Sequence, residues 1–155
     1  MRKGLLEDHY WRSREWPYKD IPHKIIAEKF LDDHTGKELN DYKWWCFNGE
    51  PRVMYRTIKS SNYAEIFENF YDMDFNPLYI DHGFSRHTPE FDRPEQFEEM
   101  RGLACRLSEG IPFVRIDFFV VEGQVYFSEY TFYDWSGMRK FGGDWDKKLG
   151  EMLKL

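Results

Sequence analysis

Four polar residues in the last third of the chain have the types and the spacing of a metal and phosphate site. Arg115 and Asp117 lie two positions apart in one β-rich run, and Glu129 and Thr131 lie two apart in the next. Residues two apart on a strand point to the same face of a sheet. Carboxylate oxygens suit Mg²⁺, and a neighbouring arginine balances phosphate charge. The same pattern is also typical of charges on the solvent face of a half-exposed sheet.

Whether the two pairs meet depends on the length of the turn between their strands. A two-residue turn at Glu122-Gly123 would direct Glu129 to the face opposite Asp117. A three-residue turn that also includes Val121, with Gly123 in the left-handed conformation, would place Arg115 opposite Glu129. We predict an odd number of residues between the strands, because only then do Arg115, Asp117 and Glu129 share a face.

Other possible site residues have simpler explanations. Asp72 and Asp74 form a D-x-D triplet that could hold a divalent cation and a nucleotide-sugar, but a solvated turn is the simpler interpretation in a chain with 28 acidic residues. Asp81, His82 and His87 could contribute metal ligands. No third or fourth ligand lies at zinc spacing from them, so unrelated loop side chains are the simpler interpretation. Cys46 and Cys105 lie in apolar surroundings without a CxxC spacing, which predicts buried, reduced thiols.

The composition indicates one folded domain without a nucleic-acid-binding face. The chain has 155 residues, is 41% hydrophobic and 19% aromatic, and carries a formal net charge of −6. This content of apolar side chains excludes a disordered chain, and the absence of a Lys/Arg cluster argues against nucleic acid as a partner. No apolar run approaches the ~18 residues that span a bilayer, and the N-terminal residues are too charged for a signal peptide. We therefore expect a cytoplasmic protein without a membrane span.

The elements that position these residues are predicted from hydrophobic pattern and turn chemistry. Lys24 to Leu31 (KIIAEKFL) predicts a buried strand, and Asp32 to Asn40 predicts a loop. Two β-rich runs, Asp41 to Phe47 and Arg52 to Thr57, flank Asn48-Gly49. Asn and Gly tolerate the positive φ angles of a tight turn, so this stretch predicts a β-hairpin.

The second half of the chain predicts a helix and a second strand pair. Ser60 to Asp81 is ambiguous between helix and strand, and we favour extended structure from Phe70 onward. The sequence from Asp92 to Glu95 predicts a capped helix start, and apolar residues at helical spacing carry a helix from Pro94 to Glu109. The remaining predicted elements are strands at Phe113 to Val121 and Gln124 to Phe132 and short helices at Leu5 to Arg14 and Asp144 to Leu153. The predicted fold class is α+β, an antiparallel sheet with packed helices.

Several of these segments occur in an order that is characteristic of a known family. They are IIAEKFL, DYKWWCFNGEP, the capped helix, PFVRIDFFVVEGQVYFSEYTF and SGM. In this order they resemble the C-terminal lobe of an ATP-grasp enzyme. More narrowly, they resemble the TupA-like branch of teichuronopeptide biosynthesis, which is found among bacterial polysaccharide-biosynthesis proteins. The resemblance covers most of the chain from about Glu15 onward.

The resemblance implies a nucleotide site at the start of the lobe. Glu28 to Leu31 matches the hinge between the two lobes that clamp ATP, where the backbone of Lys29 and Leu31 would meet the adenine edge. Asp41 falls where an acidic residue accepts the ribose hydroxyls. We accordingly predict that the hinge strand ends near Leu31 and that the backbone from Glu28 to Leu31 borders a concave, partly apolar slot.

The resemblance also implies roles for the four polar residues described first. Asp117 and Glu129 match the Mg²⁺ ligands, and Arg115 matches the arginine that contacts phosphate or the acceptor carboxylate. Thr131 stands where most ATP-grasp enzymes have asparagine as a third metal ligand. Its neutral hydroxyl is a poorer ligand than the amide oxygen.

A division of the chain follows from the same resemblance. Residues 1–22 match a remnant of a preceding lobe, and residues 23–155 match the ATP-grasp C-terminal lobe. In enzymes of this fold the lobe with the phosphate-binding lysines and the glycine loop precedes the hinge, and only about two dozen residues precede it here. We expect either a truncated reading of a longer enzyme or a degenerate relative, inactive as an isolated chain.

The function that the resemblance implies is the ATP- and Mg²⁺-binding half of a carboxylate–amine or carboxylate–thiol ligase in bacterial cell-surface polysaccharide biosynthesis. Its partners would be a small-molecule or glycan-precursor substrate and a missing N-terminal lobe. One alternative is a metal-dependent glycosyltransferase that uses Asp72 and Asp74 and responds to nucleotide-sugars and Mn²⁺. Another is an inactive binding domain, which would show neither nucleotide-dependent stabilisation nor turnover.

Overall fold

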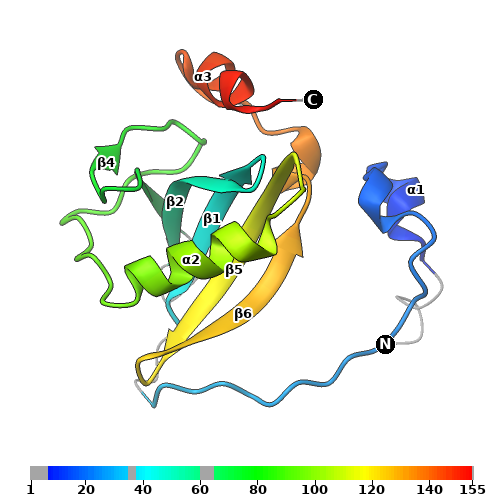
Figure 1. Cartoon of the computed structure of the whole chain (residues 1–155), viewed down its shortest axis with the longest axis horizontal. Coiled ribbons are helices and arrows are strands. Elements are labelled where there is room, and N and C mark those ends of the chain that lie inside the picture. The colour runs from blue at the N-terminus through cyan, green and yellow to red at the C-terminus, as the bar shows by residue number, and fades with distance from the viewer. Residues whose placement is uncertain (1–6, 35–37, 60–64, 155) are drawn as a thin grey trace.

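A six-stranded antiparallel sheet forms the centre of the protein (Figure 1). The computed structural model describes residues 7–34, 38–59 and 65–154. The strands, in sequence order, are β1 (Asp41–Phe47), β2 (Glu50–Lys59), β3 (Ile66–Tyr71), β4 (Pro77–Leu78), β5 (Phe113–Val121) and β6 (Gln124–Thr131). Their order across the sheet is β4-β3-β2-β1-β5-β6, and every neighbouring pair is antiparallel. The sheet confirms the predicted α+β class.

Helices cover the sheet and one of its ends. The α-helices are α1 (His9–Ser13), α2 (Phe97–Leu107) and α3 (Trp145–Met152), and the 3₁₀ turns are η1 (Trp16–Tyr18) and η2 (Asp134–Gly137). In Figure 1, α2 lies across β1 and β5, whereas α3 lies beyond one end of the strands. No helix in the described ranges is long and apolar enough to span a membrane.

The alternation of side chains along β1 gives the sheet a core on each face. Trp44 points to the face covered by α2, where its ring centroid lies 5.0 Å from that of Phe97. Trp45, the next residue, points to the other face and packs with Tyr55, Phe70 and Leu149. Both tryptophans are at most 1% exposed. Burial of an aromatic ring of this size contributes about 1.5–3 kcal/mol, so each face is stabilised independently of the other.

The two predicted strand pairs are confirmed. Asn48 and Gly49 connect β1 and β2 with φ angles of 52° and 82°, the left-handed values that the Asn-Gly pair predicts. The second pair is β5 and β6. The predicted helices near residues 94–109 and 144–153 are present as α2 and α3. The predicted helix from Leu5 to Arg14 is present as α1, with its first two residues outside the described part of the chain.

The predicted strand at Lys24 to Leu31 is wrong. These residues have no regular secondary structure, and their apolar side chains face solvent, with Ile25, Ile26 and Phe30 being 61%, 78% and 83% exposed. In Figure 1 the segment runs as an extended trace that leads away from the α1 region. The apolar residues favour a strand, but no described strand lies beside them to accept their backbone hydrogen bonds.

Three further details differ from the sequence-based expectations. Strand β3 begins at Ile66, before the predicted Phe70, because IFENFY pairs with β2. Helix α2 begins without a side-chain cap, since Gln96 occupies the N-cap position. Cys46 is buried as predicted, but Cys105 is exposed. The buried positions of α2 include Ala104, and the following residue lies about 100° further around the helix.

Candidate functional site

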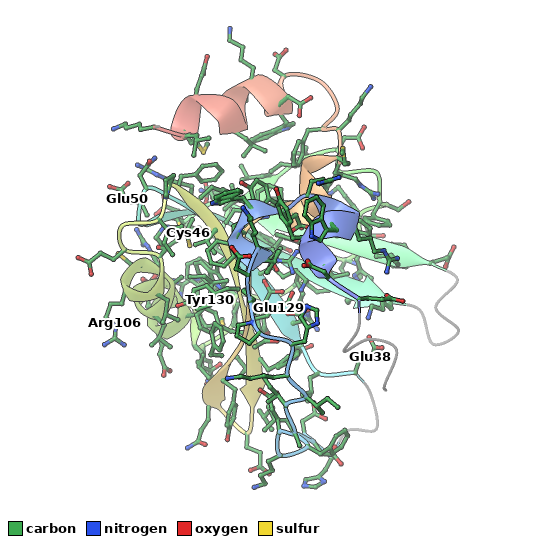
Figure 2. The ribbon with its side chains drawn as sticks, turned by 90° about the vertical axis from the view of Figure 1, so that its right-hand side faces the viewer. Glu38, Cys46, Glu50, Arg106, Glu129 and Tyr130 are labelled. Atoms are coloured by element: carbon green, nitrogen blue, oxygen red, sulfur yellow. The ribbon has the colours of Figure 1, made fainter. Side chains whose placement is uncertain are left out.

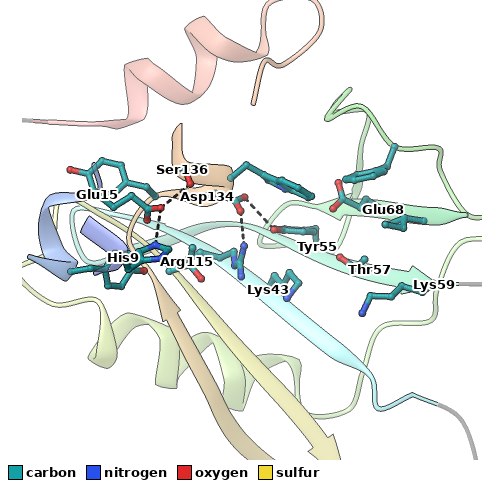
Figure 3. Close-up of a pocket in the computed structure, with 16 residues that line it drawn as sticks. His9, Glu15, Lys43, Tyr55, Thr57, Lys59, Glu68, Arg115, Asp134 and Ser136 are labelled. Atoms are coloured by element: carbon teal, nitrogen blue, oxygen red, sulfur yellow. Dashed lines mark hydrogen bonds and ion pairs between the residues drawn. The ribbon is translucent and has the colours of Figure 1, made fainter. Parts of the chain in front are cut away.

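The polar residues of the predicted site lie on the sheet face opposite α2. Figure 2 shows Tyr130 directed toward α2 and Glu129 directed to the other side of β6. The Tyr130 hydroxyl donates to the Leu107 carbonyl of α2 at 3.3 Å, which fixes this orientation. A pocket of about 440 Å³ opens on the Glu129 side, and Arg115, Thr131 and Lys43 are among the residues that line it (Figure 3).

Asp117 is the buried centre of an ion-pair network. Its carboxylate is only 1% exposed and accepts hydrogen bonds from Lys43 Nζ at 2.6 Å and from Arg115 Nε and NH2 at 2.7 and 2.8 Å. The antiparallel register places Lys43 of β1 directly opposite Asp117 of β5. A buried carboxylate without a partner would be costly, so the two cations are what allow Asp117 to be charged in this position.

Arg115 joins Asp117 to two further carboxylates. Its NH2 donates to Glu129 Oε1 at 2.6 Å, and its NH1 donates to Asp134 Oδ1 at 2.6 Å. Burial lowers the pKa of Arg115, but neighbouring acidic groups, Tyr55 and Asp117 foremost, raise it above its ordinary value. The guanidinium is therefore a fixed positive charge, held on three sides in one orientation.

A β-bulge brings Glu129 to the same face as Asp117. The turn between β5 and β6 has only two residues, Glu122 and Gly123, with φ angles of 51° and 78°, so the predicted three-residue turn is wrong. Asp117 pairs with Glu129, but the next residue, Phe118, pairs with Phe127, so Ser128 is an extra residue in β6. The bulge supplies the odd residue, and the predicted shared face of Arg115, Asp117 and Glu129 is confirmed.

Lys43 has two carboxylate partners. Its ammonium lies 2.6 Å from Asp117 and 2.5 Å from Asp41. Burial disfavours the charged ammonium, but the negative charges of Asp117 and Asp41 outweigh this and raise the pKa of Lys43. Burial also raises the pKa of Asp41, against the opposing effect of Lys43. The ammonium is thus the more firmly charged member of this pair.

Sequence reasoning missed three residues of the network: Lys43, Tyr55 and Asp134. Asp134 Oδ2 accepts from the Tyr55 hydroxyl at 3.3 Å (Figure 3). The same oxygen accepts from Trp45 Nε1 at 3.1 Å. The alternation of Asp41, Lys43 and Trp45 was a signal for Lys43, because residues two apart on a strand share a face. Asp134 had no such signal, since it lies in η2 after the last strand.

The N-terminal helix closes one side of the pocket. Glu15, 6% exposed, accepts a hydrogen bond from Ser136 Oγ at 2.8 Å, and its Oε1 lies 3.4 Å from His9 Nε2 (Figure 3). These contacts connect the segment that contains α1 and η1 to η2, which is more than 100 residues further along the chain. The pocket therefore has walls from both ends of the described chain.

Thr131 lies beside the network, and only some of the predicted adenine-side residues line a common hollow. Thr131 donates to Glu129 Oε1 at 3.1 Å and lines the pocket. Leu31 and Asp41 together line a second hollow of about 550 Å³, beside Phe119. Glu28 and Lys29 are exposed and do not line it. The structure thus brings two of the four predicted adenine-side residues together.

Side chains of the two alternative metal motifs, the D-x-D triplet and the loop histidines, contact other groups of the protein. Asp72 Oδ1 accepts from the backbone N–H groups of Asp74 and Asn76 at 2.9 and 2.8 Å, which makes the D-x-D triplet a capped turn. His82 is 1% exposed, and its Nδ1 lies 2.7 Å from Glu68 Oε2. His87 Nδ1 lies 2.9 Å from the Pro89 carbonyl.

The donor set of the network suits a hard divalent cation. Across residues 7–34, 38–59 and 65–154, no three His, Cys, Asp or Glu side chains are grouped so as to hold a metal by themselves. Mg²⁺ in nucleotide sites needs only one or two carboxylates, because phosphate oxygens and water complete its coordination. The carboxylates paired with Lys43 and Arg115 are those of Asp41, Asp117, Glu129 and Asp134. Four carboxylates and two cations leave an excess of two formal negative charges. Their excess charge equals that of one divalent ion.

The fold and the site define an α+β protein whose antiparallel sheet carries a buried acidic and cationic network on one face. The family model of TupA-like ATP-grasp proteins matches residues 1–154, and the chain belongs to this family. Comparison with curated protein sequences finds no match.

Proposed function

We propose that this chain forms the ATP- and Mg²⁺-binding part of an ATP-grasp carboxylate–amine or carboxylate–thiol ligase that acts in bacterial cell-surface polysaccharide biosynthesis. Membership of the TupA-like ATP-grasp family supports the nucleotide. The observation that carries the proposal is the buried network in which Arg115 contacts Asp117, Glu129 and Asp134. Its place of action is the cytoplasm, where ATP is supplied.

Asp117 and Glu129 are the residues that would hold Mg²⁺. They come from adjacent strands, are opposite one another in the register, and both accept hydrogen bonds from Arg115 NH2. Glu129 is the more available of the two, because its side chain is 55% exposed and only its Oε1 accepts from Arg115 and Thr131. A bound Mg²⁺ would neutralise phosphate charge during transfer.

Arg115 and Lys43 would orient the phosphate chain and the attacking group. Both are buried and fixed by carboxylates, so they provide positive charge without reorganisation. Leu31 and Asp41 would border the adenosine moiety in the hollow beside Phe119. A second lobe would cover the nucleotide, and the exposed Ile25, Ile26 and Phe30 offer that lobe an apolar surface.

The proposed reaction has two steps. A carboxylate oxygen of the substrate attacks the γ-phosphorus of ATP, the bond to the β-phosphate oxygen breaks, and ADP leaves. An amine or thiol then attacks the acyl carbon of the acylphosphate, loses a proton, and displaces phosphate. Arg115 would balance the charge that accumulates on the transferred phosphoryl oxygens.

A thermal-shift titration with Mg²⁺-ATP tests the proposal. Weak binding is expected because the solvent-open pocket leaves charge interactions weak. A ligand at ten times its dissociation constant stabilises the folded state by about 1.4 kcal/mol. We expect Mg²⁺-ATP at millimolar concentration to stabilise the wild type and to stabilise Glu129→Gln measurably less.

Glu122→Gln is the matched control, because Glu122 is an exposed glutamate in the turn at the other end of the same hairpin. It should respond to Mg²⁺-ATP as the wild type does. Equal stabilisation of all three proteins would contradict the assignment of Glu129. Stabilisation by a nucleotide-sugar with Mn²⁺, but not by Mg²⁺-ATP, would contradict the ligase and favour a glycosyltransferase.

A further inference from the structure

A further cavity, of about 610 Å³, lies beside the 440 Å³ pocket that Arg115 and Lys43 line, which is called the charged pocket below. This further cavity is lined mainly by apolar side chains. Its walls come from the end of the sheet, from α3 and from the chain around η1 and η2. Trp45, Phe47 and Phe113 form the wall on the sheet side, and Leu149 and Leu153 form the wall on the α3 side. A cavity of this volume and lining suits the apolar body of a small molecule.

A glycine keeps this cavity open. Residues 146, 149, 150 and 153 line it and follow the i, i+3, i+4, i+7 spacing of one helical face. Gly150 lies in the middle of that face and is itself exposed, so it borders the open side of the cavity. A Cβ at Gly150 would meet no atom within 4 Å. Glycine weakens a helix, so its presence at this position leaves the opening of the cavity free at a cost to the helix.

One cation on the wall of this cavity has no carboxylate partner. Arg139 Nε donates to the His82 carbonyl at 2.6 Å, and its guanidinium packs against the adjacent rings of Phe84 and Trp135, 4.2 and 4.5 Å from their centroids. Among the described residues it forms no ion pair. These contacts fix the plane of the guanidinium and leave its NH1 and NH2 groups for an anion. The paired N–H groups of arginine fit a carboxylate.

The apolar cavity and the charged pocket are neighbours along a shared wall. Tyr133 and Asp134 line both of them. On the opposite side, η1 contributes Pro17 to the apolar cavity and Tyr18 to the charged pocket. Phe84 and Trp135, the rings that Arg139 packs against, line the charged pocket, whereas Arg139 itself lines the apolar cavity. Arg139 therefore stands at the boundary between the two.

We propose that the apolar cavity binds the body of a substrate that is a small carboxylic acid with an aryl or branched alkyl group, and that Arg139 holds its carboxylate at the boundary with the charged pocket. This inference rests on the proposed ligase, because it assigns the class of its carboxylate substrate. The unpaired guanidinium selects an anion, and the apolar lining selects against a fully polar sugar acid. Asp134, on the shared wall, keeps the two pockets in a fixed relation through its bonds to Arg115 and Trp45.

Calorimetric titration with 4-phenylbutyrate, without nucleotide or Mg²⁺, tests this subsite. The neutral 4-phenylbutanamide and acetate test the anion and the apolar body separately. We expect the acid to bind about tenfold more tightly than either, as loss of one charge-assisted contact typically produces. Arg139→Gln should reduce the affinity for the acid to that for the amide.

A substitution that fills the cavity provides the second part of the test. Gly150→Leu should lower the affinity for the acid at least about tenfold while raising the melting temperature, because leucine is a better helix former than glycine. Gly102→Leu is the matched control, since Gly102 is an exposed glycine of α2 whose Cβ would also meet no atom within 4 Å. It should bind the acid as the wild type does. Gly150→Ala, a smaller filling, should give an intermediate loss.

Three results would overturn the subsite: equal affinity for the acid and the amide, wild-type affinity in Gly150→Leu, or no binding of the acid to the wild type at millimolar concentration. Because the titration contains no nucleotide, these results leave the assigned roles of Asp117 and Glu129 intact. Conversely, Glu122→Gln, at an exposed turn residue that lines neither pocket, should bind the acid as the wild type does.

Discussion

Two regions of the protein carry similar mixtures of apolar and charged residues but differ in what surrounds them. In the network of β1 and β5, Lys43 and Asp117 are brought together by the strand register, and both are largely buried. In residues 21–34 the side chains of Ile26 and Phe30 are 78% and 83% exposed, and the backbone has no strand partner among the described residues. A neighbouring strand, rather than the local sequence, decides whether such a run becomes a strand.

The largest expected effect comes from truncating one phenylalanine that packs on β1 and one in the N-terminal segment. Phe97 is fully buried beneath the sheet, and Phe30 is exposed in the N-terminal segment. Phe97→Ala should lower the free energy of unfolding by about 3–5 kcal/mol, because it leaves a cavity in the core. Phe30→Ala should change it by less than about 0.5 kcal/mol. Urea denaturation measures both, and similar losses would show that the N-terminal segment packs against the fold.

A smaller but still large effect is expected from the charged network. Asp117→Ala should lower the free energy of unfolding by about 3 kcal/mol, because Lys43 and Arg115 then lie buried with one partner fewer. Glu129→Gln should cost less than about 1 kcal/mol, since the Glu129 side chain is 55% exposed. Equal costs for the two variants would contradict the difference in burial between the centre and the edge of the network.

A pH effect should follow from the buried phenol of the same network. Burial raises the pKa of Tyr55 well above its ordinary value, so the native state keeps a proton that the unfolded state loses above about pH 10. Stability contributed by this phenol is therefore full below the unfolded pKa and falls as the pH rises beyond it.

Tyr55→Phe should make the loss of stability at high pH shallower, by up to about 1.4 kcal/mol per pH unit. The free energy of unfolding, measured by urea denaturation on both sides of the unfolded pKa, checks this. Tyr79→Phe is the control, because Tyr79 is 73% exposed. An unchanged slope in Tyr55→Phe would show that the phenol is not shielded from solvent.

The sequence predicted those parts of the fold that depend on local chemistry. Asn48-Gly49 specifies its own turn, and the apolar spacing of α2 specifies its own helix. Partners from distant segments decide the rest. Lys24 to Leu31 has the composition of a strand but no neighbour, and Asp134 reaches Arg115 only because the chain after β6 turns back over the sheet. The extra residue in β6 is a serine with no distinguishing signal. The shared face of Asp117 and Glu129 therefore required one odd residue in the hairpin, but the sequence did not show where that residue lies.

The smallest expected effect concerns the two thiols, one of which the sequence placed incorrectly. Burial raises the pKa of Cys46 to about 12, whereas Cys105 is exposed on α2. At about pH 8 a thiol reagent should label Cys105 rapidly and leave Cys46 unmodified in the folded protein. Mass spectrometry of the labelled peptides checks this, and Cys105→Ser should abolish the rapid phase. Rapid labelling of both thiols would mean that the core beneath α2 opens readily.

The single extra residue at Ser128 has a consequence for how the length of this hairpin can change. Deleting it would remove the bulge and leave a regular hairpin in which Glu129 still pairs with Asp117 and Tyr130 still faces α2, because residues paired across a two-residue turn have an even number of residues between them. A single deletion elsewhere between the turn and Glu129 would be absorbed in the same way, by loss of the bulge. The hairpin can therefore lose one residue without turning Glu129 away from the charged pocket, and the bulge acts as a reserve of length.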